Sequence, residues 1–138
     1  MGHAGFSPIV PLQGAEVVKV VDTIKRRVIE RTGVNFVCAI FPTNDRSAMI
    51  VSSLSFDRTS EQHVKDTFDT VRLLIEEVGA MGYGEYRAHL HFMDAASDQF
   101  SFGDHAYQRF VESIKDAVDP KGILSPGRHG VWPAKYRD

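Results

Sequence analysis

Tyr86 and Arg87 are adjacent in the sequence and combine a phenolic hydroxyl with a permanently charged guanidinium. A guanidinium presents a planar set of N–H donors, which suits anionic partners better than a lysine ammonium does. Successive strand residues point to opposite faces, so both side chains can serve one site only if the backbone bends. Gly82 and Gly84, just before them, favour such a bend. The alternative is an exposed Tyr-Arg pair at the start of a strand.

Two histidines follow, and their spacing raises the question of a metal site. His89 and His91 are separated by one residue, so in a strand they would face the same side. Such a pair binds zinc or copper only with a third ligand. Glu85 and Asp94 are near in sequence, but nothing fixes their geometry. We therefore expect no metal site, and interpret the histidines as hydrogen-bonded residues lining the core or a cap.

The composition of the 138 residues is that of an ordinary globular domain, with 43% hydrophobic residues, 25% charged residues and a net charge of −2. The mixed signs argue against nucleic-acid binding, which needs a concentrated basic surface. No apolar run approaches the length of a membrane span, and no signal-peptide pattern is present. Cys38 is the only cysteine, which excludes an internal disulfide. These features predict a cytoplasmic protein without nucleic-acid or membrane partners.

Hydrophobic periodicity predicts an α+β fold for the first two thirds of the chain. Thr59 or Ser60 is expected to cap the second helix, with Gln62 completing a capping box with Thr59. The expected order is strand, helix, strand, strand, helix and strand, over residues 6–12, 15–32, 34–41, 47–56, 60–78 and 85–92. This order is typical of a ferredoxin-like antiparallel sheet with two helices on one face.

The character of the sequence changes after Asp94. Residues 95–103 predict a polar loop or short helix, and Asp104 is expected to cap a further helix that ends before Pro120. A C-terminal helix followed by an irregular tail is therefore expected. The tail contains several glycines and prolines that impose a specific backbone path, and Trp132 is interpreted as its packing anchor.

Three stretches of the sequence resemble one known family. They are His3-Ala-Gly-Phe-Ser-Pro8, then Gly84-Glu-Tyr-Arg-Ala-His-Leu90 with Phe92-Met-Asp94, and Asp119-Pro-Lys-Gly-Ile-Leu-Ser-Pro-Gly-Arg128 with Gly130-Val-Trp-Pro133. In this order they resemble the C-terminal segment of vanillyl-alcohol oxidase, eugenol oxidase and p-cresol methylhydroxylase. The resemblance covers nearly the whole chain.

The resemblance implies an FAD-dependent oxidoreductase that removes hydride from the benzylic carbon of a para-substituted phenol, via a quinone methide. Residues 1–94 would form the second half of the substrate cap domain. Residues 95–138 would form the helix and tail that return to an FAD-binding domain lying upstream. The segment alone is expected to be inactive, and the family resemblance implies a homo-oligomer.

The resemblance also assigns roles to single residues. Tyr86 would donate a hydrogen bond to the phenolate oxygen, and Arg87 would stabilise both the phenolate and the reduced flavin. His3 would form a covalent bond to FAD, a position where cresol-type relatives have tyrosine. Its alternative interpretation is a frayed terminus or an expression remnant. Arg128 would contact the flavin or its phosphates, or else it is a surface cation.

Two other functions compete with this interpretation. The chain could be a free-standing ferredoxin-like domain that binds a small molecule without flavin or catalysis. It could also be a small enzyme or oligomeric binding protein of unrelated ancestry. The tail around Trp132 argues against unrelated ancestry, because a ferredoxin-like fold alone does not need it.

Overall fold

A computed structural model describes residues 1–137 and divides the chain into two compact units. The first comprises Met1–His89 and the second begins at Leu90. All the strands that pair in the sheet belong to the first unit, together with the two longest helices.

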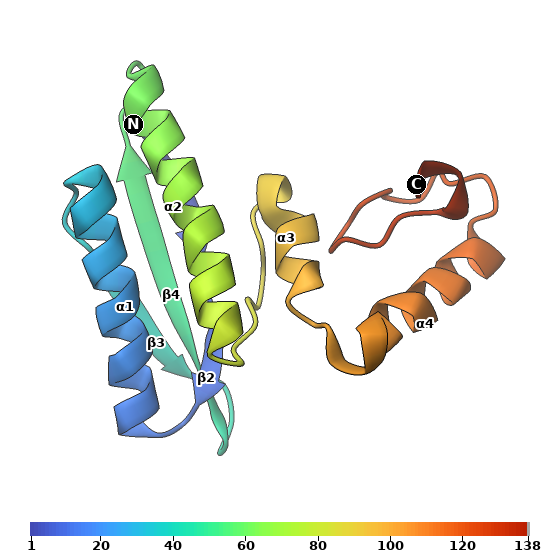
Figure 1. Ribbon diagram of the computed structural model, residues 1–138, viewed down its shortest axis with the longest axis horizontal. Helices are drawn as coiled ribbons and strands as arrows, with labels where there is room; N and C mark the ends of the chain where they lie inside the picture. Colours follow the sequence, from blue (N-terminus) through green and yellow to red (C-terminus); the bar gives the residue numbers. More distant parts are fainter. Residues whose placement is uncertain (138) are drawn as a thin grey trace. The chain divides into compact units, whose positions relative to one another are not determined.

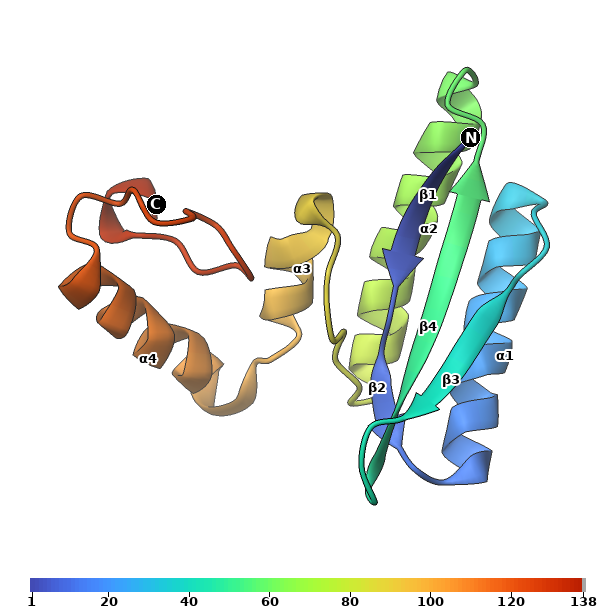
Figure 2. The same ribbon diagram turned by 180° about the vertical axis from the view of Figure 1, so that it is seen from behind.

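The first unit is built around one long strand, β4 (Ser47–Phe56), to which three other strands pair in antiparallel fashion. β1 (Gly2–Phe6) pairs with the second half of β4, and β2 (Ile9–Pro11) pairs with its first half. β3 (Cys38–Pro42) pairs with β4 along the opposite edge (Figure 2). The sheet is therefore antiparallel throughout.

Two helices, α1 (Gly14–Thr32) and α2 (Glu61–Ala80), cover one face of this sheet (Figure 1). Their apolar faces recur at helical spacing and supply the core, because residues three and four apart lie on the same side of a helix. On the sheet, alternate residues of β1 and β4 face the helices. The core formed between them includes Phe6, Val20, Ile24, Ile50, Leu54, Val71, Leu74 and Val78.

The ends of the two helices follow local rules. α1 ends at Gly33, whose φ of +67° is the left-handed conformation that favours glycine. Ser60 caps α2, because its side-chain oxygen accepts the backbone N–H of His63. The capping box expected for Thr59 and Gln62 is wrong. Thr59 instead bonds the carboxylate of Asp57, and Gln62 donates to Asp66.

The α+β class with two helices on one face of an antiparallel sheet is confirmed, but one expected strand does not form. Residues 85–92 were expected to be extended. Only Glu85 pairs there, in an isolated bridge with Pro8, and the chain then enters a 3₁₀ turn at Leu90–Phe92. The residues of this stretch have suitable types for a strand, but no partner strand continues beside them.

The second unit contains α3 (Met93–Asp98), α4 (Phe102–Val118) and the tail, which ends in a short 3₁₀ turn at Ala134–Tyr136. α4 begins with a turn in which Gly103, Asp104 and His105 all have positive φ, and regular helix follows. Asp104 is therefore not a simple helix cap, contrary to expectation. Pro120 follows the end of α4, as predicted.

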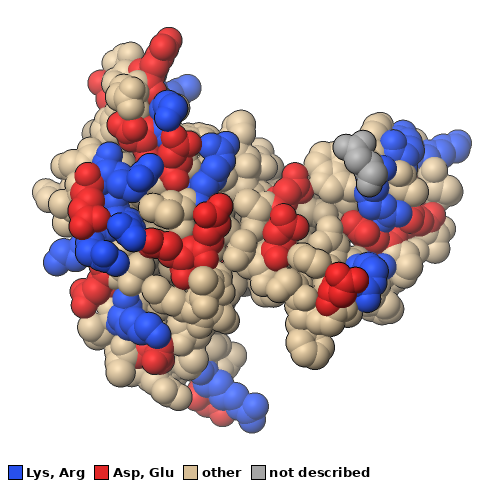
Figure 3. Space-filling model, in the orientation of Figure 1, with Lys and Arg blue, Asp and Glu red and all other residues tan. Residues whose placement is uncertain are grey.

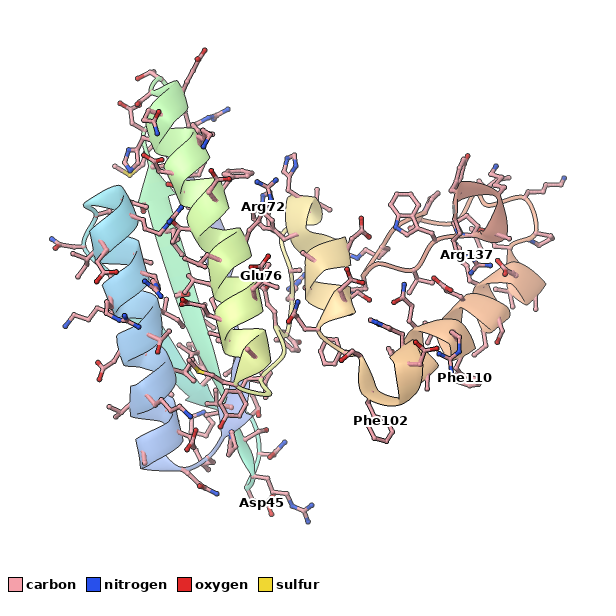
Figure 4. The ribbon with its side chains drawn as sticks, in the orientation of Figure 1. Asp45, Arg72, Glu76, Phe102, Phe110 and Arg137 are labelled. Atoms are coloured by element: carbon pink, nitrogen blue, oxygen red, sulfur yellow. The ribbon has the colours of Figure 1, made fainter. Side chains whose placement is uncertain are left out.

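Polar contacts hold the tail against one side of α4. Arg137 pairs with Glu112 and Asp116, and Asp116 also accepts the backbone N–H of Ala134. The side of α4 that carries Phe110 has no buried residue, and Figure 4 shows Phe102 extending from the first turn of this helix. The polar side chains of α4 therefore find partners within the unit, and its apolar side chains remain exposed.

The tail takes the irregular path that its glycines predict. Gly127 has φ +76° and lies directly beneath Trp132, so an added Cβ would come within 2.4 Å of the indole ring. The indole Nε1–H donates to Asp94 at 2.9 Å. The expectation that Trp132 anchors the tail is therefore confirmed within this unit.

The surface charges are mixed. Figure 3 shows acidic and basic side chains interspersed over α1 and α2, on the face that it presents. Arg27 and Glu77 link these helices through two hydrogen bonds, one of them 2.9 Å from Arg27 Nε to Glu77 Oε2. No helix among residues 1–137 combines the length and apolarity of a membrane span.

Candidate functional site

The backbone bends at Tyr86 and Arg87, immediately after a short pairing with the first strand segment. Tyr86 N donates to Ser7 O at 2.8 Å, and Ile9 N donates to Gly84 O at 3.0 Å. These two bonds flank the bridge between Pro8 and Glu85. The bend that the two site residues were expected to need is therefore present.

The side chains of Tyr86 and Arg87 face solvent. Tyr86 is 61% exposed and Arg87 is exposed as well. Within the described residues, neither the Tyr86 hydroxyl nor the Arg87 guanidinium forms a hydrogen bond or ion pair. A donor and a cation are thus both available to an anionic ligand.

His3 lies in β1, where it pairs with Ser55 of β4. Its neighbours Ala4 and Phe6 point into the core, so alternation places His3 on the sheet face that the helices leave open (Figure 2). The imidazole is exposed and has no hydrogen-bond partner among the residues described.

The register relates Tyr86 to His3. Tyr86 follows the bridge residue Glu85 and donates its backbone N–H to Ser7. Ser7 and His3 are four residues apart, so alternation places them on the same face of the sheet. Tyr86 is therefore held beside the same strand edge as His3, about 13 Å further along at the usual rise per residue.

Arg128 belongs to the second unit. It lies exposed in the tail loop and is paired by an isolated bridge with Val131. A cavity of about 300 Å³ in that unit is lined by Arg128 together with Met93, Asp94 and Trp132. The first unit thus contains His3, Tyr86 and Arg87, and Arg128 lies in the other unit.

The carboxyl group of Glu85 lies in a partly buried environment that the sequence did not reveal. Its Oε1 accepts the backbone N–H of Ser7 at 3.3 Å, and its Oε2 is buried with no hydrogen-bond partner among residues 1–137. Burial raises the pKa of this carboxyl to about 7, and the Ser7 N–H opposes that rise only partly. Its position inside the Gly-Glu-Tyr-Arg motif was the only available signal.

The two histidines after the motif do not share a strand face, contrary to expectation, because the chain there is not a strand. His89 packs edge-on against Phe68, with ring centroids 5.8 Å apart. His91 lies in the 3₁₀ turn that opens the second unit. The described part of the chain contains no group of three or more histidine, cysteine or acidic side chains placed to hold a metal.

Comparison with known proteins gives a consistent set of relatives. The chain is 31% identical over 130 residues to the flavoprotein subunit of 4-cresol dehydrogenase (hydroxylating) from Pseudomonas putida, covering 94% of this chain and 24% of that protein. It is 27% identical over 135 residues to 1'-carboxy-chondrochloren decarboxylase from Chondromyces crocatus, covering 96% of this chain and 24% of that protein. No family model matches the chain.

Solved structures agree with the sequence comparison. The 4-ethylphenol oxidase from Gulosibacter chungangensis, in its isoeugenol complex, matches with a TM-score of 0.91 and 32% identity over 99% of this chain and 26% of that one. The p-cresol methylhydroxylase with substrate bound matches with a TM-score of 0.88 and 28% identity over 99% of this chain and 25% of that one. Such identity argues for common ancestry and against convergence.

The resemblance expected from the three motif stretches is thus confirmed. The chain spans about a quarter of the length of the relatives that it matches. Over almost its entire length, the chain is similar to about a quarter of the 4-cresol dehydrogenase flavoprotein subunit and of the 4-ethylphenol oxidase.

Proposed function

We propose that this chain is part of an FAD-dependent oxidoreductase that oxidises para-substituted phenols. The observation that carries the proposal is the match over 94% or more of the chain to 4-cresol dehydrogenase and 4-ethylphenol oxidase. The solvent-facing pair Tyr86 and Arg87, in the same unit as His3, supports it. Because the chain is a quarter of its relatives' length, the proposal includes an FAD-binding part outside these residues and an inactive isolated segment.

The side chains of the first unit fit a flavin. An exposed imidazole at His3, on an open sheet face and without a partner among the described residues, is suited to covalent attachment. A guanidinium without a counter-ion at Arg87 suits the negative charge of a reduced flavin. When bound, FAD would accept the hydride that leaves the substrate, and with it the two electrons of the oxidation.

The residues of this chain would act on the phenol itself. The Tyr86 hydroxyl donates a hydrogen bond to the phenolate oxygen, and the positive charge of Arg87 stabilises the same oxygen. Both interactions favour the ionised phenol, because they lower its pKa. Loss of hydride from the benzylic carbon of a phenolate leaves a neutral quinone methide, and addition of water then gives the benzylic alcohol.

The mass and colour of the protein test the flavin part of this proposal. We expect the purified chain to be yellow and, after denaturation, to exceed its sequence mass by one FAD when it is produced together with the rest of its enzyme. His3→Ala should return the mass to that of the sequence. His129→Asn, which removes an exposed imidazole from the second unit, should leave the added mass unchanged.

Other results would change the assignment. An added mass that persists in His3→Ala would move the covalent link to another residue. A colourless chain of plain sequence mass would contradict the covalent link and favour a free-standing domain that binds a small molecule without flavin.

A further inference from the structure

The segment that carries Tyr86 is attached to the sheet by very few contacts. Gly84 and Tyr86 each make one backbone hydrogen bond to the segment Ser7–Ile9. No further ladder follows, because the chain bends directly afterwards. The direction of the Tyr86 side chain therefore depends on this short pairing and on whatever strengthens it.

Glu85 adds a third contact to the same short pairing. Its Oε1 accepts the N–H of Ser7 at 3.3 Å, so its side chain bonds the residue whose carbonyl accepts the N–H of Tyr86. The register places Glu85 opposite Pro8, which is buried, and therefore on the core side of the sheet. Tyr86, the next residue, donates its N–H to Ser7 and opens the bend that follows this pairing.

The environment of Glu85 is suited to the neutral acid. Its Oε2 is buried without a hydrogen-bond partner among the described residues, which an ionised carboxylate would tolerate poorly. Burial is the largest cause of its raised pKa, the Ser7 N–H opposes it, and no charged side chain is among the causes. A neutral carboxyl retains the carbonyl oxygen that accepts the Ser7 N–H.

We propose that Glu85 is a positioning residue that fixes the segment Gly84–Tyr86 against Ser7–Ile9 and so sets the place of Tyr86 relative to His3. This inference rests on the proposed function for the roles of Tyr86 and His3. The attachment itself is a property of the folded chain and requires neither phenol nor flavin.

Amide hydrogen exchange of the 138-residue chain, followed by NMR near pH 6, tests this attachment directly. In Glu85→Ala, the amides of Ser7, Ile9 and Tyr86 should exchange about tenfold faster, because the side-chain bond is lost and the short pairing opens more often. Amides of the β3–β4 ladder should stay within about twofold of the wild type. Glu30→Ala, which removes an exposed glutamate of α1, should accelerate none of them.

The variant Glu85→Gln separates a positioning role of Glu85 from a general contribution to packing. Glu85→Gln keeps a neutral group with a carbonyl oxygen, so it should restore wild-type exchange at Ser7, Ile9 and Tyr86. In the wild type, raising the pH from 6 to 8 should accelerate exchange at these amides beyond the intrinsic base catalysis seen elsewhere. This excess should vanish in Glu85→Gln.

Two outcomes would overturn the inference. One is unchanged exchange at all three amides in Glu85→Ala. The other is equal acceleration throughout the first unit, which would make Glu85 an ordinary stabilising residue. Failure of the phenol-oxidising function would appear instead in the mass, colour and turnover of the enzyme, with the exchange pattern unaffected.

Discussion

At the scale of single residues, the proposed site depends on placing a hydrogen-bond donor and a fixed positive charge where an oxyanion would lie. Tyr86 and Arg87 have this character because they are exposed and have no polar partner within the described part of the chain. Replacing Arg87 by alanine should therefore lower kcat/KM for a para-alkyl phenol by about 100-fold in the complete enzyme. Arg87→Lys should lower kcat/KM less than Arg87→Ala does, because lysine keeps the positive charge although it lacks the planar guanidinium.

A substrate that cannot ionise provides the control for this prediction. The methyl ether of the same phenol has no acidic proton, so its binding should be nearly the same in wild type and Arg87→Ala. Equal losses of affinity for the phenol and its ether would show that Arg87 shapes the pocket without stabilising a phenolate.

The carboxyl of Glu85 makes a separate prediction about stability. Its pKa is about 7 in the folded chain against 4.5 ordinarily, so the folded state binds more protons than the unfolded state between these values. The contribution to stability is fully present below about pH 4.5, is lost as the pH rises through 7, and amounts to about 3 kcal/mol in total. Urea unfolding at a series of pH values should show this loss in the wild type. A Glu85→Gln variant that retained the same pH dependence would assign it to another group.

At the scale of elements, α1 and β4 were predictable and the last strand was not. α1 begins one residue before its expected start and ends at the expected residue, because an apolar face repeating at three and four residues is a local signal. β4 was also predicted with its observed limits. The expected strand from Glu85 to Phe92 failed, because a strand needs a neighbour, and a partner distant in sequence leaves no mark on local propensity.

The tail of the second unit makes a prediction at the same scale. Gly127→Ala places a methyl group 2.4 Å from the Trp132 ring at a φ of +76°, so both strain and collision oppose it. We expect a loss of about 3 kcal/mol in the free energy of unfolding of that unit. Circular dichroism would measure it, and fluorescence of Trp132, the only tryptophan, would report on the ring.

Gly33→Ala is the matched control for this prediction. Its φ of +67° is similar, but no atom lies within 4 Å of the added Cβ. It should therefore cost only the strain of the left-handed conformation, about 1 kcal/mol. Equal losses in the two variants would mean that contact with Trp132 adds nothing to the requirement for glycine.

At the scale of the whole molecule, motifs in the sequence indicated which residues form the candidate site. The structure added the arrangement of these residues, because that depends on pairing between segments far apart in the sequence. His3, Tyr86 and Arg87 were expected from the resemblance, and they lie in one unit. That Tyr86 is held beside the strand that carries His3 follows only from the pairing of residues 84–86 with residues 7–9. The burial of the Glu85 Oε2 atom was equally out of reach, because a glutamate in a polar motif is ordinarily exposed.

The exposed apolar side of α4 is another feature that belongs to the whole molecule, because it is formed by residues from successive turns of the helix. Tyr107, Phe110, Ile114 and Val118 recur at helical spacing and are 69%, 62%, 46% and 67% exposed. Figure 4 shows Phe110 on this helix. The contacts between α4 and the tail use the other side, at Glu112 and Asp116. Exposed apolar surface of this kind favours association.

The isolated chain should therefore self-associate through this side of α4. Sedimentation velocity at increasing concentration should show a shift from monomer to larger species, and Ile114→Glu should weaken the association at least about tenfold, because burying a carboxylate in an apolar contact is costly. Ser113→Glu adds the same charge to the same helix about 100° away and should have little effect, since consecutive helical residues differ by that angle.

A wild-type chain that remains monomeric at every concentration, or equal effects of the two variants, would exclude this face as the contact.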